Sequence, residues 1–205
     1  MYQHILWDFD GTLFDTYPVM AAVFERMLRE RGIAEPPEEI QRYMRVSMTV
    51  ALRHYREKYA LDAAFLDEYK HRRRDAEKQA CHPFPGVDAL LRHICDSGRA
   101  NYLYTHRSES ANDLLQRHGI AGLFADFITS VQKFARKPSP DAIRYLMGKH
   151  RMDQDTAVMI GDRELDILAA KNAGIDAIFF GLYGDCCAAA DVSVSSIGEL
   201  AALLD

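Results

Sequence analysis

The chain has 205 residues and 48% of them are hydrophobic, enough for one large domain or for one domain carrying a smaller insertion. Its formal net charge is -5, which argues against a surface built to bind nucleic acid or an anionic membrane. No stretch reaches the ~18 apolar residues that span a bilayer, and the N-terminus lacks the basic region of a signal peptide. We therefore expect a cytoplasmic protein without a nucleic-acid or membrane partner.

The four cysteines indicate neither a disulfide framework nor a zinc site. None of them forms a C-x-x-C pair, and no histidine lies at the spacing of a zinc ligand. Reduced thiols are the expectation for a cytoplasmic protein. These residues are Cys81, Cys95, Cys186 and Cys187.

The chain begins with a predicted strand and continues with a block of predicted helices. Residues 4–9 form a short apolar run that ends in the turn sequence Asp10-Gly11-Thr12. From about residue 17 to residue 80 no convincing strand appears, and apolar residues repeat at helical spacing, for example over residues 19–28. The basic run at residues 70–74 has acidic residues around it, so we interpret it as a salt-bridged, solvated helix face.

After residue 86 the pattern alternates between strands and helices. One helix is predicted over residues 87–94, a second around Leu114, a third opening with Ser139 as its cap and Pro140 in its first turn, and a fourth around Leu165 that ends by Gly174. This alternation predicts an α/β fold, a Rossmann-like parallel sheet covered on both faces. The later strands are predicted at residues 100–104, 127–129, 157–160, 177–180 and 192–194.

Polar residues follow the predicted strands at the positions where a parallel sheet collects its ligands. Asp8 and Asp10 come at the end of the first strand, and Thr105, Lys137 and Asp162 follow later ones. Because the carboxyl ends of parallel strands share one edge of the sheet, we expect these side chains to face one crevice.

The chemistry of this set indicates a magnesium and phosphate site. Asp8, Asp10, Asp162 and Asp166 offer only hard oxygen ligands, which favour magnesium over zinc. Lys137 adds a positive charge, and the hydroxyl of Thr105 lies next to free backbone N–H groups suited to a phosphoryl oxygen. Asp166 alone is also typical of a first-turn helix acid, and this interpretation stays open beside the functional one.

Four motifs together resemble the haloacid dehalogenase superfamily. Residues 8–15, Asp-Phe-Asp-Gly-Thr-Leu-Phe-Asp, match its D-x-D-G-T-L-x-D opening. Thr105, Lys137 and residues 161–166, Gly-Asp-Arg-Glu-Leu-Asp, match its second, third and fourth motifs in the same order. The resemblance covers nearly the whole chain, and the layout is most similar to the phosphoglycolate phosphatase-like branch with a helical cap.

The resemblance implies a role for each motif residue. Asp8 would attack phosphorus to form an aspartyl-phosphate, and Asp10 would protonate the leaving alcohol and then activate water. Thr105, Lys137 and the backbone N–H of His106 would hold the phosphoryl group. Magnesium would be bound by Asp8, the backbone carbonyl of Asp10 and Asp162, with Asp166 in support.

Two positions bear on the branch of the family. The family's dehalogenases lack the second aspartate, so the presence of Asp10 argues against dehalogenation. Relatives often carry asparagine where this chain has His106, which leaves the role of that side chain open.

We therefore predict a catalytic core from residues 1–15 and 82–205 and a helical cap from residues 16–81, with a return hinge near residues 83–86. The predicted activity is magnesium-dependent hydrolysis of a small phosphomonoester. A sugar phosphomutase on the same scaffold, or a phosphate-binding module without turnover, are the alternatives. The motifs leave the substrate and the oligomeric state open.

Overall fold

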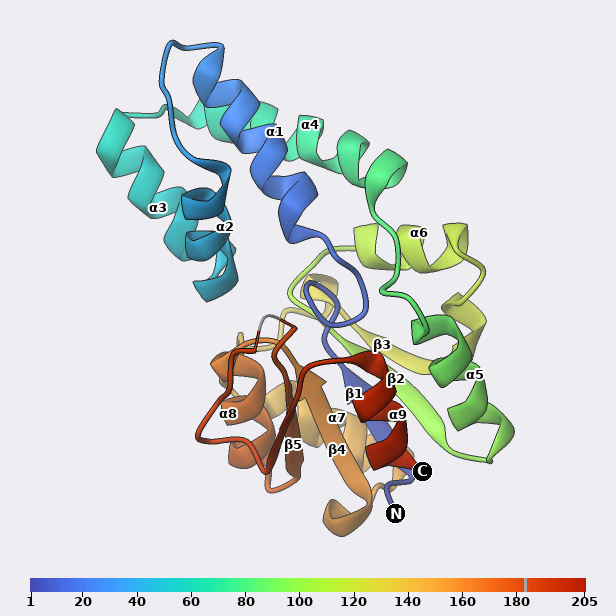
Figure 1. Cartoon of the computed structure of the whole chain (residues 1–205). Coiled ribbons are helices and arrows are strands. Elements are labelled where there is room, and N and C mark those ends of the chain that lie inside the picture. The colour runs from blue at the N-terminus through green and yellow to red at the C-terminus, as the bar shows by residue number, and fades with distance from the viewer. Residues whose placement is uncertain (183) are drawn as a thin grey trace. The chain divides into compact units, whose positions relative to one another are not determined.

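The chain divides into two units, and a computed structural model describes residues 1–182 and 184–205 of it. The core unit consists of Met1–Phe14 and Pro83–Asp205, and the helical unit consists of Asp15–His82 (Figure 1). The chain leaves the core unit after Phe14 and returns to it at Pro83, and the two connecting segments are hydrogen-bonded to each other. The Phe84 N–H donates to the Leu13 carbonyl, and the Asp15 N–H donates to the His82 carbonyl.

A six-stranded, fully parallel sheet in the order β3-β2-β1-β4-β5-β6 forms the centre of the core unit and confirms the predicted fold class. From β1 the strands follow one another toward one edge of the sheet, and from β4 they follow one another toward the other edge. The boundary between β1 and β4 is therefore the switch point, where such sheets bind ligands. The strands are β1 His4–Trp7, β2 Ala100–Tyr104, β3 Phe124–Ile128, β4 Ala157–Gly161, β5 Asp176–Phe180 and β6 Val192–Val194.

The helices of the core unit follow the prediction with two differences. The third predicted helix starts later, with Pro140 at its cap position, and Ser139 instead accepts a hydrogen bond from the Asp141 N–H. A last helix was not predicted, although Ser196 caps it by accepting from the Glu199 N–H. The helices are α5 Val87–Asp96, α6 Ser110–Arg117, α7 Asp141–His150, α8 Glu164–Ala173 and α9 Ile197–Leu204, with 3-10 turns η1 Ala121–Leu123, η2 Ser130–Gln132 and η3 Gln154–Thr156.

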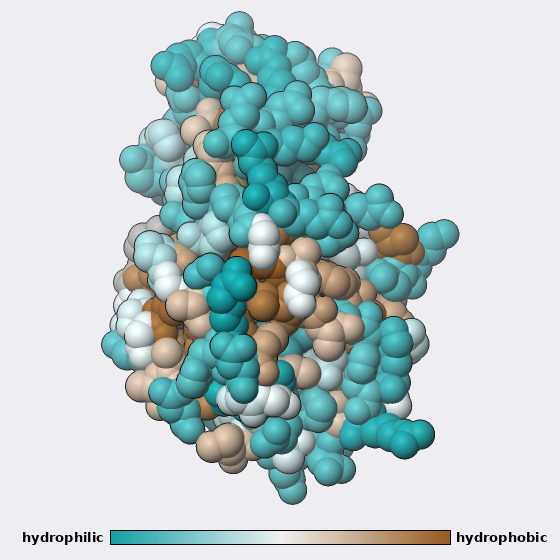
Figure 2. All heavy atoms as spheres, turned by 90° about the vertical axis from the view of Figure 1, so that its right-hand side faces the viewer, coloured by the Kyte–Doolittle hydropathy of each residue, from teal (hydrophilic) through white to brown (hydrophobic). Residues whose placement is uncertain are grey.

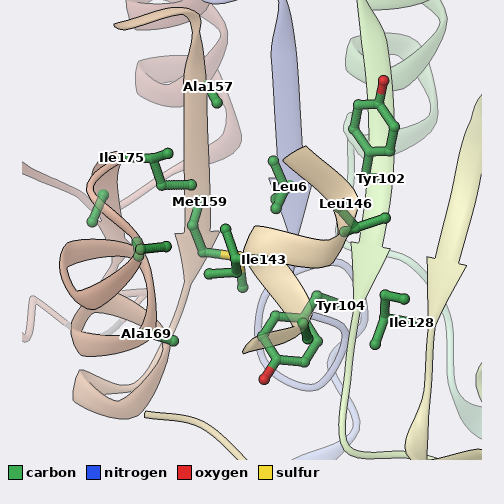
Figure 3. Close-up of a cluster of buried hydrophobic side chains, with 14 of the residues drawn as sticks. Leu6, Tyr102, Tyr104, Ile128, Ile143, Leu146, Ala157, Met159, Ala169 and Ile175 are labelled. Carbon is green, nitrogen blue, oxygen red and sulfur yellow. The ribbon is translucent and has the colours of Figure 1, made fainter. Parts of the chain in front are cut away.

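Helices α7 and α8 cover one face of the sheet with an apolar layer. Ile143 and Leu146 of α7 pack against Leu6 of β1, Tyr104 of β2 and Met159 of β4 (Figure 3). All five side chains are at most 2% exposed, so the central strands are anchored by burial on this side. The strands that carry the polar residues at their ends are thus packed against α7 and α8.

The other face of the sheet is tied to α5 and α9 by buried polar contacts. The Trp7 indole donates to the Asn101 side-chain oxygen at 2.9 Å, and the Asn101 amide donates to the Leu91 carbonyl of α5 at 3.1 Å. Arg99 donates to the Leu204 carbonyl at the end of α9. Buried polar groups that are satisfied in this way set a unique strand register, because each alternative register would leave them without partners.

The helical unit has its own core around an aromatic cluster. Phe24 of α1 contacts the rings of Tyr55, Phe65 and Tyr69, with centroids 5.0–5.6 Å apart. The basic run forms the predicted salt-bridged face, since Arg72 pairs with both Glu30 and Glu68. The helices of this unit are α1 Tyr17–Arg29, α2 Pro37–Val46, α3 Met48–Tyr59 and α4 Ala63–Ala80.

The surface of the two units differs in character. The face turned to the viewer in Figure 2 is hydrophilic over most of the helical unit, and the core unit shows apolar patches there. Among the described residues, no helix is both long and apolar enough to cross a membrane. All four cysteines are free thiols in the structure.

The apolar layer under α7 generates a stability prediction. Truncation of Ile143 to alanine is expected to lower the free energy of unfolding by about 2–5 kcal/mol, because it leaves a cavity against the central strands. Val131→Ala is the matched control, since Val131 is 52% exposed and its truncation should change that free energy by at most about 0.5 kcal/mol. Urea unfolding followed by circular dichroism measures both, and equal effects would contradict the placement of this layer.

Candidate active site

The sheet brings the predicted site residues of the core unit to one edge. Asp8 directly follows β1, Thr105 follows β2 and Asp162 follows β4, while Lys137 lies in the loop that leads from β3 to α7. Strands β2, β1 and β4 are neighbours, so residues about 150 positions apart in the chain become adjacent. Gly11 has a φ of +76°, in the region that favours glycine, and lets the chain turn sharply after Asp10.

Lys137 is the centre of this site. Its ammonium lies 2.6 Å from Asp8 Oδ1 and 2.7 Å from Asp166 Oδ1, and it donates to the Tyr104 carbonyl at 2.8 Å. The side chains of Lys137 and Asp166 are 0% exposed, and that of Asp8 is 1% exposed. A buried ammonium is tolerated only when its charge and its donors are satisfied, and three oxygens from separate elements do so here.

Three carboxylates gather at this edge in the geometry of a cation site. One oxygen each from Asp8, Asp162 and Asp166 lies within 4.8 Å of the others. The guanidinium of Arg163 reaches all three, at 3.4 Å from Asp8 Oδ2, 3.7 Å from Asp162 Oδ1 and 3.5 Å from Asp166 Oδ2. Lys137 and Arg163 together supply two positive charges against three negative ones, so the cluster keeps a net negative charge of one.

Burial and neighbouring charges move the pKa values of these groups in opposite directions. Burial raises the pKa of Asp8 to about 6, Asp166 adds to the rise, and Lys137 and Arg163 oppose it. Burial also acts to raise the pKa of Asp166, but Lys137 and Arg163 outweigh it and hold that pKa below its usual range. For Lys137, burial acts to lower the pKa, and the attraction of Asp166 and Asp8 raises it nonetheless.

Asp10, the second aspartate of the first motif, forms an ion pair with an arginine. Its Oδ1 lies 2.6 Å from Nη1 of Arg107, whose side chain is only 5% exposed. The Arg107 guanidinium also lies over the ring of Phe9, 5.2 Å from its centroid, and contacts Ser110 Oγ at 3.4 Å. The two aspartates of the first motif therefore have different partners, Lys137 for Asp8 and Arg107 for Asp10.

The loop after β2 presents Thr105 at the same edge. Its N–H donates to the Ile128 carbonyl at 2.9 Å, and its hydroxyl oxygen accepts from the Arg107 N–H at 3.2 Å. The hydroxyl proton of Thr105 is then available to donate elsewhere. The side chain of His106 accepts a hydrogen bond from the Lys137 N–H at 2.9 Å.

Asp166 has the contacts of a first-turn helix acid and also contacts the site, so both interpretations that the sequence leaves open apply to it. Its Oδ2 accepts from the Arg163 N–H at 3.1 Å, as a first-turn helix acid does, while its Oδ1 contacts Lys137. Gly161 makes this approach possible, because a Cβ at Gly161 would lie 2.3 Å from the Asp166 Cβ.

Two arginines of the site were not predicted from the sequence. Arg107 and Arg163 follow the motif positions Thr105 and Asp162 closely, and that adjacency was the signal available. The direction of an arginine side chain depends on its long rotatable stem, which no sequence pattern specifies.

The contact between Gly161 and Asp166 generates a prediction. Gly161→Ala is expected to lower the free energy of unfolding by about 1–3 kcal/mol or more, because Asp166 must be displaced from its buried bond to Lys137. Gly122→Ala is the matched control, since a Cβ there meets nothing within 4 Å. Thermal unfolding of both variants checks this, and a Gly161→Ala protein as stable as the control would contradict the close approach.

Comparison with known proteins shows the family of this chain. The sequence profile of the haloacid dehalogenase-like hydrolases matches residues 5–180. Proteins named phosphoglycolate phosphatase are 31% identical over 192 residues in Vibrio vulnificus (88% of this chain, 83% of that protein) and 30% identical over 195 residues in Neisseria meningitidis (89% and 82%).

Solved structures share the fold over the full chain. A hydrolase from Streptococcus pneumoniae is 29% identical with a TM-score of 0.72 and covers 100% of this chain and 98% of its own. A haloacid dehalogenase family hydrolase from Deinococcus radiodurans, with bound phosphate and sodium, has a TM-score of 0.83 at 22% identity, covering 99% of this chain and 95% of its own. These matches confirm the family predicted from the four motifs: the chain belongs to the haloacid dehalogenase-like hydrolases.

Proposed function

We propose that this protein hydrolyses a small phosphomonoester through an aspartyl-phosphate on Asp8. The observation that carries the proposal is the environment of Asp8, a buried carboxylate whose Oδ1 lies 2.6 Å from the Lys137 ammonium. The curated relatives are named phosphatases, which supports the same reaction class. A carboxylate beside a fixed cation, at the sheet edge where ligands bind, is suited to attack a phosphoryl group that the same cation neutralises.

The proposed first step transfers the phosphoryl group to Asp8. A carboxylate oxygen of Asp8 forms a bond to phosphorus while the bond from phosphorus to the ester oxygen breaks. Lys137 and the Thr105 hydroxyl donate to phosphoryl oxygens, and the backbone N–H of His106 lies in the same loop as a further donor. The ester oxygen leaves as an alcohol, which requires a proton.

Asp10 is the proposed source of that proton. It gives the proton to the leaving oxygen and then takes one from the water that attacks phosphorus, which releases inorganic phosphate and restores Asp8. Arg107 would keep the Asp10 carboxylate at a fixed place between these steps, through the contact at 2.6 Å.

The carboxylate cluster fits a magnesium ion, which the family implies. Asp8 and Asp162 would hold it together with the backbone carbonyl of Asp10, and Asp166 would support the site. The donors are all oxygens, and three of them lie within 4.8 Å of one another, as a hard divalent cation requires. When bound, the ion would neutralise charge on the phosphoryl oxygens.

The helical unit is the proposed selector of substrates. We propose that residues 16–81 act as the cap predicted from the sequence, with the core formed by residues 1–15 and 82–205. Because the curated relatives carry the name phosphoglycolate phosphatase, 2-phosphoglycolate heads the panel of phosphoesters to be tested.

Release of phosphate from p-nitrophenyl phosphate and from this panel tests the function. We expect release in the presence of magnesium, none after treatment with EDTA, and a loss of at least about 1,000-fold in Asp8→Asn. Asp88→Asn is the matched control, since Asp88 is an exposed residue of α5 that forms an ion pair with Arg92. Undiminished release in Asp8→Asn, or no release from any ester by folded wild-type protein, would contradict the proposal.

The position of Arg163 predicts how the metal site responds to its loss. Because this guanidinium lies within 3.7 Å of all three carboxylates, it repels a divalent cation at the same place. We expect Arg163→Gln to bind magnesium about five- to tenfold more tightly, measured from the magnesium concentration that raises the melting temperature. Arg144→Gln, whose arginine donates to the Asn172 carbonyl, is the control, and unchanged or weaker affinity in Arg163→Gln would contradict this role.

A further inference from the structure

The side chain of His106 forms a bond that crosses from one loop of the site to another. Its Nε2 accepts a hydrogen bond from the backbone N–H of Lys137 at 2.9 Å. His106 lies in the loop after β2, and Lys137 lies 31 residues later, beyond β3. The bond therefore joins the carboxyl ends of two neighbouring strands through one imidazole ring.

Lys137 is held at both of its ends by the same short segment, residues 104–106. The Tyr104 carbonyl accepts from the Lys137 ammonium at 2.8 Å, and the His106 ring accepts from the Lys137 N–H. Thr105 lies between these two contacts and is 2% exposed. The spacing between the Thr105 hydroxyl and the Lys137 ammonium is thereby set by direct bonds within one segment.

Packing alone does not fix the ring of His106. A cavity of about 190 Å³ lies beside it, lined by Tyr104, Thr105, Thr129 and Arg136 among others. The His106 ring lies at a distance of 6.1 Å between centroids from the ring of Tyr104. With space on one side of the ring, the hydrogen bond to Lys137 is a specific contact that holds the ring in place.

The positive charges around His106 favour a neutral imidazole ring, which can accept a hydrogen bond. Burial, together with Lys137, Arg136 and Arg163, lowers the pKa of His106 to about 3. A neutral imidazole that accepts at Nε2 carries its proton on Nδ1, so the geometry specifies one tautomer.

We propose that His106 is a positioning residue for Lys137: its Nε2 anchors the Lys137 backbone so that the ammonium stays between Asp8 and the phosphoryl group. This rests on the proposed function. Loss of the acceptor leaves the Lys137 N–H without its partner and lets the loop shift, and a shift of about 1 Å in a charged group of an active site can lower turnover about 100-fold.

Two variants separate the hydrogen bond from the bulk of the ring. His106→Leu removes the acceptor, and His106→Gln restores one, because its side-chain carbonyl oxygen reaches about as far as Nε2. We expect His106→Leu to lower kcat for p-nitrophenyl phosphate by about 10- to 100-fold with little change in KM, and His106→Gln to recover kcat to within about threefold of wild type. His93→Leu, at an exposed histidine of α5, is the matched control.

The kcat values of the two variants distinguish a hydrogen-bonding role of His106 from a role in packing alone. A His106→Leu protein with wild-type kcat, or equal losses in both variants with unchanged melting temperatures, would overturn the proposal. Recovery by glutamine alone supports it, since a role in packing would favour the apolar leucine.

A spectroscopic readout tests the bond without turnover. In ¹⁵N-labelled wild-type protein we expect the His106 ring to carry its proton on Nδ1, and a scalar coupling to appear between the Lys137 amide nitrogen and Nε2 across the hydrogen bond. A proton on Nε2, or no coupling, would overturn the proposal. If no phosphoester is hydrolysed, the proposed function fails, while this coupling still decides the role of His106.

Discussion

The buried ammonium of Lys137 is the constraint on which the rest of the site depends. A lysine whose side chain is 0% exposed must have oxygen partners at every donor, and these come from the strand end at Asp8, the carbonyl of Tyr104 and the helix start at Asp166. Loss of any of these partners leaves a donor of the buried ammonium without an acceptor, which costs about 1–3 kcal/mol or more. The ends of β1 and β2, the loop after β3 and the first turn of α8 are therefore placed relative to one another by one positive charge.

The sheet explains why these partners can meet at all. With β1 in the middle of the order and β2 and β4 on either side, the residues that follow these strands share one edge. The apolar layer under α7 and the buried Asn101 network on the other face hold the strands in register. Gly161 then allows Asp166 to approach the end of β4 more closely than any side chain would permit. Burial of the apolar layer keeps the strands in place, and the polar side chains at the edge of the sheet would carry the proposed reaction.

Much of this arrangement could be predicted from the sequence, because parallel strands buried on both faces read as continuous apolar runs that end in polar motifs. Asp8, Thr105 and Asp162 follow strands as expected. The predicted start of β3 is three residues too late, because Asp126 interrupts the apolar run of this edge strand. The partners of Asp10 and His106 could not be predicted, because they depend on the rotamers of Arg107 and on the path of the Lys137 loop. Side-chain direction is set by tertiary packing, which a local pattern does not contain.

The central claim is that Asp8 becomes covalently phosphorylated, and trapping of that species tests it most directly. Protein mixed with a phosphoester that it hydrolyses is quenched within a turnover and reduced with borohydride, which converts an aspartyl-phosphate to homoserine. Peptide mass spectrometry then locates the change. The account predicts homoserine at position 8 in wild-type protein and none in protein incubated without substrate. Homoserine at another aspartate, or none at any position during active turnover, would contradict it.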